Sequence, residues 1–358
     1  MNLLVAGGGT GGHLFPGLAV AQEVRRRRPS AKILFVGTRS GLEAEAVPKA
    51  GFEVEFLPVS GLKRVGLVAT LKGLLKLPLA LLQAFLVVFR FRPDVAISVG
   101  GYAAGPAILA AYFCRVPVAV MEQNALPGVT NRILGHLAYK IFAGLPTNSF
   151  KAEKLSVVGN PVRTFIDEIK PKEYVQGQAL GLLVMGGSQG AVALNNAMIA
   201  ALPLIKSAGL QLEIVHQTGK RDYERVRAAY ESAGVDATIC SFIDDMAQIY
   251  SRSHFVIGRA GASSVAELAL CGLPSLLVPF PYAADNHQEA NARILSDNGA
   301  AFMVLEQNLS GEKIAETLQD LTQYPEKLKA MAVSALGQAK PNAAASIVDE
   351  LENEVGNV

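Results

Sequence analysis

Short apolar runs alternate along the chain with longer segments in which apolar residues recur every three or four positions. In the first half the apolar runs cover residues 3–6, 33–36, 95–98 and 116–121. Runs that are apolar at nearly every position are typical of strands buried on both faces of a sheet. The segments 18–28 and 129–138 between these runs have the spacing of helices.

A second series of the same kind begins near residue 179. Its apolar runs cover residues 180–185, 212–216, 255–257 and 275–278. The segment 191–206 between two of them carries Leu194, Met198, Leu202 and Ile205 on one helical face. Strands that alternate with helices indicate parallel sheets of the doubly wound type. We therefore expect an α/β protein made of two Rossmann-like domains.

The segment 165–178 separates the two series. It is polar and contains Pro171 and Gly177, which makes it a junction or the start of the second domain. We predict a first domain over residues 1–160 and a second over residues 161–340.

The last segment, 342–358, has the apolar spacing of a helix. Ile347, Val348, Leu351 and Val355 fall on one face, and such a face has to be buried against another element. We expect this helix to dock back on the first domain.

Composition narrows the function classes. Half of the 358 residues are apolar and 18% are charged, so disorder is excluded. The net charge of +2 gives no case for nucleic acid. Cys114, Cys240 and Cys271 lie far apart, which predicts reduced thiols rather than disulfides or a metal site. The start of the chain has the pattern of a strand and not of a secretion signal.

Glycine-rich turns follow three of the predicted strands. They read GGGTGG at residues 7–12, GGYAAG at 100–105 and GGSQG at 186–190. Backbone amides in such a turn, together with the positive end of a helix, can bind an anion or a sugar, although one turn alone equally serves as a tight connection. Three turns at strand ends across two domains favour a ligand site.

The first turn does not have the spacing of a dinucleotide-binding fingerprint. The second strand ends in FVGTRSG, without the acidic residue that would bind the ribose of NAD, and Arg39 leaves NADP as a weak alternative. No GKS or GKT sequence is present, which excludes a phosphate-loop NTPase. His13 follows the first turn. Its position fits either a histidine bonded to backbone at a helix start or a base at the rim of a site.

The second half contains VIGRAGASSVAELALCGLP, a strand, a turn of small residues and a helix. Ser264 and Glu267 have the spacing of a capping box, which explains both without a ligand. The alternative is that this helix N-terminus binds a diphosphate while Glu267 accepts hydrogen bonds from a ribose. The adjacent Asp244 and Asp245 are better explained as a solvated or helix-capping pair than as metal ligands.

Seven motifs, in order and with similar spacing, resemble the MurG family of bacterial N-acetylglucosaminyltransferases over residues 1–340. They are GGTGGHLFPGLAVA, GGYAAGP, EQNALPGVTNR, VGNPVR, MGGSQGA, FIDDM and RAGASSVAELALCGLP. The resemblance implies a GT-B fold, with two domains facing across a cleft. It also implies inverting transfer of N-acetylglucosamine from UDP-N-acetylglucosamine to the C4 hydroxyl of the muramoyl sugar of lipid I. The product is lipid II for peptidoglycan synthesis, and neither a metal nor another cofactor is expected.

The same resemblance assigns roles to individual residues. The donor-binding residues are Thr10, Gly11, Gly12, Asn124, Arg163, Ser188, Ile243, Ala262, Ser263, Ser264, Val265, Ala266, Glu267 and Gln288. Gly101, Tyr102 and Gly105 are expected on the acceptor side. His13 is the first candidate for the general base and Glu122 the second. The family usually has a histidine where this chain has Met121, which adds weight to His13.

A basic and apolar segment covers residues 61–93. It contains six Lys or Arg and no acidic residue before Arg92, and its uncharged part begins at Leu77 and ends at Phe89. That part is too short to cross a bilayer, which needs about 20 residues. It predicts either a buried helix or a surface for anionic lipids.

Because the acceptor of the family is polyprenyl-linked, we expect peripheral attachment to the cytoplasmic face of the inner membrane and contacts with cell-wall synthesis complexes. Two rival functions remain open from the sequence. One is a UDP-N-acetylglucosamine 2-epimerase of the same fold, and the other is a non-catalytic nucleotide-sugar-binding scaffold.

Overall fold

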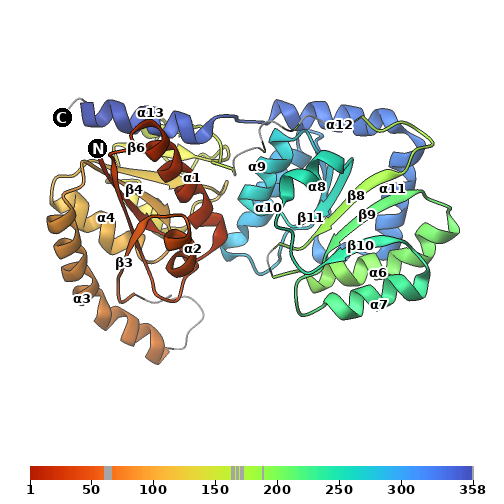
Figure 1. Ribbon diagram of the computed structural model, residues 1–358, viewed down its shortest axis with the longest axis horizontal. Helices are drawn as coiled ribbons and strands as arrows, with labels where there is room; N and C mark the ends of the chain where they lie inside the picture. Colours follow the sequence, from red (N-terminus) through yellow and green to blue (C-terminus); the bar gives the residue numbers. More distant parts are fainter. Residues whose placement is uncertain (60–66, 163–165, 167–168, 170–172, 188, 357–358) are drawn as a thin grey trace. The chain divides into compact units, whose positions relative to one another are not determined.

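The computed structural model describes the chain except residues 60–66, 163–165, 167–168, 170–172, 188 and 357–358, and the side chains of residues 67–76. The chain forms two compact units (Figure 1). Unit 1 consists of Met1–Thr164 and Asn342–Val358, and unit 2 consists of Phe165–Pro341.

Unit 1 is a parallel sheet covered by helices, as the alternating pattern predicts. The strand order is β3-β2-β1-β4-β5-β6-β7. The strands are β1 Asn2–Gly7, β2 Lys32–Gly37, β3 Glu53–Phe56, β4 Val95–Gly100, β5 Val118–Glu122, β6 Lys140–Ala143 and β7 Leu155–Val157. The α-helices are α1 Gly11–Arg27, α2 Glu43–Lys49, α3 Leu67–Phe91, α4 Ala104–Phe113, α5 Val129–Leu134 and α13 Ala343–Gly356, and a short 3-10 helix, η1, covers Ala152–Lys154.

Unit 2 repeats the architecture with the strand order β10-β9-β8-β11-β12-β13. The strands are β8 Leu180–Met185, β9 Leu212–Gln217, β10 Ala237–Cys240, β11 Phe255–Gly258, β12 Ser275–Leu277 and β13 Ala301–Met303. The α-helices are α6 Val192–Ser207, α7 Tyr223–Ala233, α8 Met246–Arg252, α9 Ala262–Leu270, α10 His287–Ser296, α11 Gly311–Gln323 and α12 Pro325–Gly337. The short 3-10 helices η3 and η4 cover Ala284–Asn286 and Glu306–Asn308.

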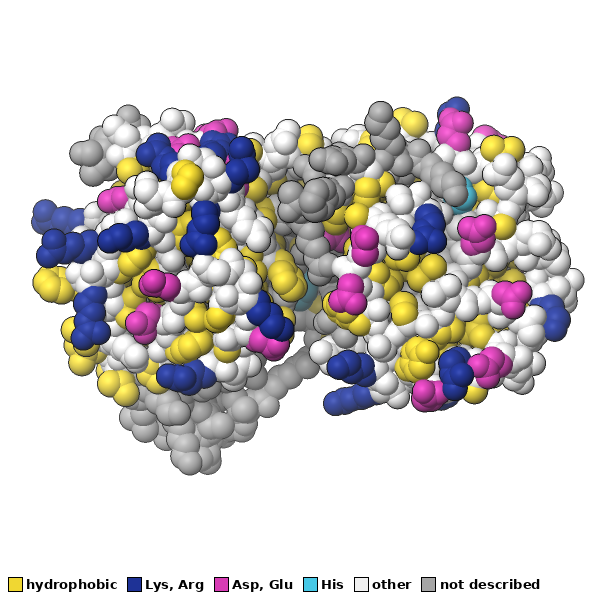
Figure 2. Space-filling view, in the orientation of Figure 1, with side chains coloured by type: hydrophobic (Ala, Val, Ile, Leu, Met, Phe, Trp, Pro, Cys, Tyr) yellow, Lys and Arg dark blue, Asp and Glu magenta, His cyan; other side chains and the backbone are white. Residues whose placement is uncertain are grey.

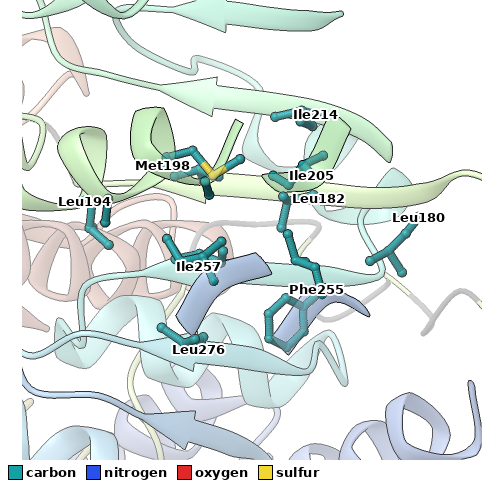
Figure 3. Packing of buried hydrophobic residues seen from close by; sticks show 14 of the residues in the cluster. Leu180, Leu182, Leu194, Met198, Ile205, Ile214, Phe255, Ile257 and Leu276 are labelled. Carbon is teal, nitrogen blue, oxygen red and sulfur yellow. The ribbon is translucent and has the colours of Figure 1, made fainter. Parts of the chain in front are cut away.

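The core of unit 2 confirms the helical face predicted for α6. Leu194, Met198, Leu202 and Ile205 are each at most 2% exposed. Figure 3 shows residues of this face beside strand residues such as Ile257 of β11. Burial of such side chains is the main favourable contribution to folding, at roughly 1.5–3 kcal/mol for each large apolar residue.

The C-terminal helix α13 packs against α1 within unit 1 (Figure 1). Ile347, Val348 and Leu351 are fully buried in the core beneath it. Arg27, in the last turn of α1, forms ion pairs with Asp349 and Glu352. The basic end of α1 therefore offsets the helix dipole, as its position indicates, and also fixes the C-terminal helix.

Candidate functional site

The first and second glycine turns meet at the carboxyl edge of the unit 1 sheet, because β1 and β4 are neighbours there. The amide of Gly8 donates to the carbonyl oxygen of Gly100 at 3.0 Å. A Cβ atom at Gly101 would lie 2.6 Å from the oxygen of Gly8. Gly8 and Gly101 also have φ of +138° and +90°, a region that other residues rarely adopt. Glycine is therefore required where these two turns interlock.

His13 lies over this junction, in the first turn of α1. Its Nδ1 is 3.2 Å from the hydroxyl oxygen of Thr10, the residue that precedes α1. A Cβ atom at Gly100 would lie 3.2 Å from His13 Cδ2 and 3.3 Å from Asn131 Nδ2, so the ring rests against the second glycine turn. If Nδ1–H donates to Thr10, Nε2 is the basic nitrogen.

Glu122, the second candidate base, is held by donors from the loop after β5 and from helix α5. It ends β5 and is only 1% exposed. Oε1 accepts from the amide and the side chain of Asn124 at 3.0 and 3.2 Å. Oε2 accepts from the amide of Gly128 at 3.2 Å and from Asn131 Nδ2 at 2.9 Å. A carboxylate that accepts four hydrogen bonds organises this loop and is a weak candidate for a base, which leaves His13 as the stronger one.

The same loop explains the position where the family usually has a histidine. Met121 precedes Glu122 in β5, is 1% exposed and belongs to the hydrophobic core of unit 1. Its backbone oxygen accepts from Asn131 Nδ2 at 3.0 Å. Met121 thus contributes packing and a carbonyl, but no proton-carrying group.

The other candidate ligand-binding residues of unit 1 differ in solvent exposure. Thr10 and Gly12 are exposed, and a Cβ atom at Gly12 or Gly105 would meet no atom within 4 Å. The amides at the start of α1 have no acceptor within the helix. Tyr102 is 46% exposed. These positions can contact a ligand without rearrangement.

In unit 2, α9 begins at Ala262 and its N-cap is Gly261, which has no side chain to cap the helix. The predicted capping box is therefore wrong. Ser264 already lies inside the helix, and Glu267 Oε2 instead accepts from the hydroxyl of Tyr250 at 2.9 Å. The buried hydroxyl of Ser263 has no hydrogen-bond partner in the described part of the chain. This leaves a polar group and a helix N-terminus for a bound anion.

Three neighbouring positions of α9 have buried side chains. Ala262, Val265 and Ala266 are buried, with exposed fractions of 6%, 0% and 8%. Their side chains pack in the interior. The amide of Val265 donates to the oxygen of Gly261 at 2.9 Å, so from Val265 onward the amides serve the helix itself.

The third glycine turn packs against the loop that follows β9. A Cβ atom at Gly190 would lie 2.1 Å from the oxygen of Thr218, so a side chain there would collide with backbone. Ser188 of this turn and Arg163 lie outside the described residues.

Behind the third turn is a buried polar network that sequence reasoning missed. His216 lies 3.0 Å from both the hydroxyl of Tyr230 and Asn195 Oδ1. Burial lowers the pKa of His216 to about 4, so the ring is neutral near pH 7. Asn195 Nδ2 then donates to the oxygen of Thr218 at 3.1 Å, which supports the loop against Gly190. Nothing local in the sequence connects these residues, because the contact depends on how β9, α6 and α7 pack.

The remaining donor candidates lie at the ends of other elements of unit 2. Gln288 is in the first turn of α10, and its Oε1 accepts from the amide of Phe280 at 3.0 Å. Ile243 is partly buried in the loop before α8. Asp245 caps α8 by accepting from the amide of Gln248 at 3.0 Å, which confirms the capping explanation of the acidic pair. Within the described residues, no three His, Cys, Asp or Glu side chains are grouped to hold a metal ion.

The chain matches known proteins over nearly its whole length. Residues 3–143 match the glycosyltransferase family 28 N-terminal domain and residues 181–350 match the family 28 C-terminal domain. A protein of Anaeromyxobacter dehalogenans (strain 2CP-C) is 47% identical, with 98% of this chain and 92% of that protein covered. It is named UDP-N-acetylglucosamine--N-acetylmuramyl-(pentapeptide) pyrophosphoryl-undecaprenol N-acetylglucosamine transferase.

Solved structures agree with these sequence matches. The crystal structure of Acinetobacter baumannii MurG is 31% identical, has a TM-score of 0.82 and covers 98% of this chain and 99% of its own. UDP-GlcNAc 2-epimerase from Neisseria meningitidis is 16% identical at a TM-score of 0.67, with 99% of this chain and all of the epimerase chain covered, and shares the fold alone. The two parallel α/β units thus have the GT-B architecture that the motifs predict. The chain belongs to glycosyltransferase family 28 and, within it, to the MurG family.

Proposed function

We propose that this protein transfers N-acetylglucosamine from UDP-N-acetylglucosamine to the C4 hydroxyl of the muramoyl sugar of lipid I, and so forms lipid II for peptidoglycan synthesis. The near full-length identity of 47% to a protein named for this transfer carries the proposal. Two local arrangements support it: His13 fixed over the interlocked turns of unit 1, and the open N-terminus of α9 in unit 2.

We propose that unit 2 binds the donor. The N-terminal amides of α9, with the hydroxyls of Ser263 and Ser264, would face the diphosphate, and Glu267 would accept from the ribose hydroxyls. Arg163 and Ser188 are proposed to join them at the nucleotide, and Ile243 at the uracil, while Gln288 is proposed to reach the donor sugar. A helix dipole and fixed donors can stabilise the charge on departing UDP without a divalent ion.

We propose that unit 1 binds the acceptor and activates it, with Gly101, Tyr102 and Gly105 on the acceptor side. His13 Nε2 takes the proton of the C4 hydroxyl as the oxygen attacks the anomeric carbon. The new C–O bond forms on the face opposite the breaking bond to UDP, which inverts the configuration. Thr10 keeps the ring in its tautomer, and with Gly11, Gly12 and Asn124 it would contact the donor sugar. General-base help of this kind contributes about 10²–10⁴-fold in rate.

The direct test is a transfer assay with UDP-N-acetylglucosamine and a short-chain lipid I analogue. We expect UDP release that requires the acceptor and continues in EDTA. UDP release without acceptor, together with an altered sugar, would instead identify an epimerase, and donor binding without turnover would identify a scaffold. Loss of turnover in EDTA that magnesium restores would overturn the metal-free mechanism.

We also propose that α3 attaches the protein to an anionic membrane surface. No helix in the described part of the chain is long and apolar enough to cross a bilayer. One face of α3 is buried through Ala80, Ala84 and Val88. The other face exposes Leu79, Leu82, Leu86 and Phe89, by 49–71%. The described side chains of α3 are thus buried on one face and exposed on the other. Neither the prediction of a buried helix nor the prediction of a lipid-binding surface describes α3 alone.

Aromatic and basic residues continue this surface. Phe113 of α4 is 65% exposed and its ring stacks with Phe85 of α3, with 6.4 Å between centroids. Arg90 lies in the last turn of α3, while Arg92 and Arg115 follow the ends of α3 and α4 in sequence. Figure 2 shows hydrophobic and basic side chains intermixed over the α3 side of unit 1. Apolar residues with flanking cations suit anionic headgroups, at about 1 kcal/mol for each cation near the surface.

Replacing Phe89 with glutamate should weaken binding to vesicles that contain phosphatidylglycerol by at least about tenfold, because a charge replaces an exposed ring that would enter the lipid interface. Transfer to a water-soluble acceptor analogue should not change. Val333→Glu is the matched control, since Val333 is 65% exposed on α12 of unit 2. Co-sedimentation with vesicles measures the binding of both variants. Equal binding of the two variants would contradict the proposed membrane surface.

A further inference from the structure

Glu43 is a buried carboxylate of unit 1 that the proposed chemistry does not use. It is the first residue of α2 and is 1% exposed. The end of β2 has no acidic residue in sequence. The structure brings Glu43 to that edge from the start of the next helix, where its side chain contacts both Thr38 and Gly9. These contacts indicate what Glu43 does in unit 1.

Both carboxylate oxygens of Glu43 accept hydrogen bonds from two different turns. Oε2 accepts from the amide of Gly9 at 2.7 Å. Oε1 accepts from the amide and the hydroxyl of Thr38, at 2.7 and 2.9 Å. Within the described residues no Lys or Arg pairs with it, so these neutral donors satisfy the charge. A buried carboxylate is costly without its donors, and it therefore holds them in place.

Glycines make room for this side chain. A Cβ atom at Gly37 would lie 2.3 Å from Glu43 Cγ, and one at Gly41 or Gly8 would lie 2.2 or 2.7 Å from Oε2. Three glycines from separate positions thus surround one carboxylate. Glu43 thus gives a reason for glycine at Gly37 and Gly41, and a second reason at Gly8 beside its positive φ.

The bond to Gly9 fixes the backbone that leads to His13. Gly8 is held on its other side by its bond to the oxygen of Gly100. Thr10, which follows Gly9, precedes α1 and contacts the ring of His13. A shift at Gly9 would therefore move the hydroxyl that orients the imidazole.

We propose that Glu43 is a positioning residue for His13, acting through Gly9 and Thr10. This inference rests on the proposed function for its effect on transfer, but not for its effect on the turn. It also bears on the ribose-binding acid that a dinucleotide-binding site would need at the end of β2. The acid that reaches this edge is occupied by backbone amides rather than presented to a ribose.

Glu43→Gln tests the proposal, because it keeps the shape but leaves one acceptor where two are needed. We expect kcat to fall by at least about tenfold while KM for UDP-N-acetylglucosamine stays within about twofold. Amide hydrogen exchange at Gly9 should become faster, with Val5 in the middle of β1 unchanged. The matched control is Glu45→Gln on the same helix, whose carboxylate is exposed and pairs with Lys49. It should match the native protein in all three measurements.

Each outcome decides a separate question. Native kcat in Glu43→Gln, or unchanged exchange at Gly9, would overturn the positioning role. If native protein shows no transfer at all, the proposed function fails, while exchange at Gly9 still tests Glu43. If Glu43→Gln does not fold, Thr38→Val removes only the hydroxyl donor and should show a smaller change in the same direction. Native behaviour of both kcat and Gly9 exchange in that variant would then count against the proposal.

Discussion

Replacing His13 with alanine should lower kcat by about 10²–10⁴-fold, the usual contribution of a general base. The dissociation constant for UDP-N-acetylglucosamine should stay within about threefold, because His13 is not among the proposed nucleotide contacts. The expected loss of kcat follows from the position of the imidazole. The ring is fixed by Thr10 and rests against Gly100, where it can carry a proton. Steady-state transfer kinetics and calorimetric donor binding measure the two quantities.

Two further variants separate His13 from its alternatives. His136→Ala is the control, since His136 is exposed and outside the proposed site. Glu122→Gln removes a carboxylate whose four donors come from the loop after β5 and from Asn131 of α5, so we expect it to destabilise the fold along with lowering activity. If Glu122→Gln abolishes turnover with an unchanged melting temperature, and His13→Ala does not, Glu122 is the base.

Strands buried on both faces could be predicted because their apolar runs are continuous. The run at residues 180–185 coincides with β8, and the runs near β1, β2 and β4 differ from the observed strands by a residue or two at their ends. The strand β3 alternates Glu with apolar residues at one edge of its sheet, and its short pattern gave no clear signal. α1 begins at Gly11, earlier than expected, because helical periodicity is not visible in a run of glycines.

The site was predictable only as far as local motifs extend. The glycine turns and the helix at Ala262 follow strands, and their positions could be located from sequence. The hydrogen-bond partner of Glu267 could not be predicted from sequence. It is Tyr250 of α8, whereas the sequence spacing suggested Ser264. Glu43 was missed for the same reason, since its contacts join a helix start to two turns that only the sheet order brings together.

The carboxylate of Glu267 should account for recognition of the ribose. The hydroxyl of Tyr250, itself 1% exposed, donates to Oε2 and fixes the orientation of the side chain. A hydrogen bond to a charged group is worth about 1.5–3 kcal/mol, which is about 10–150-fold in affinity. Glu267→Ala should therefore weaken UDP binding by that factor. Tyr250→Phe should weaken it less, because the carboxylate remains but is less well oriented.

A nucleotide without ribose hydroxyls distinguishes recognition from a general loss of structure. Native protein should bind UDP about 10–150-fold more tightly than 2′,3′-dideoxy-UDP, and Glu267→Ala should bind the two almost equally. Glu231→Ala, an exposed carboxylate on α7, should keep the native preference. If Glu267→Ala still prefers UDP by the native factor, the ribose is recognised elsewhere. Glu267 would then serve only to hold Tyr250 against α9, and the donor would have to be placed by other groups of unit 2.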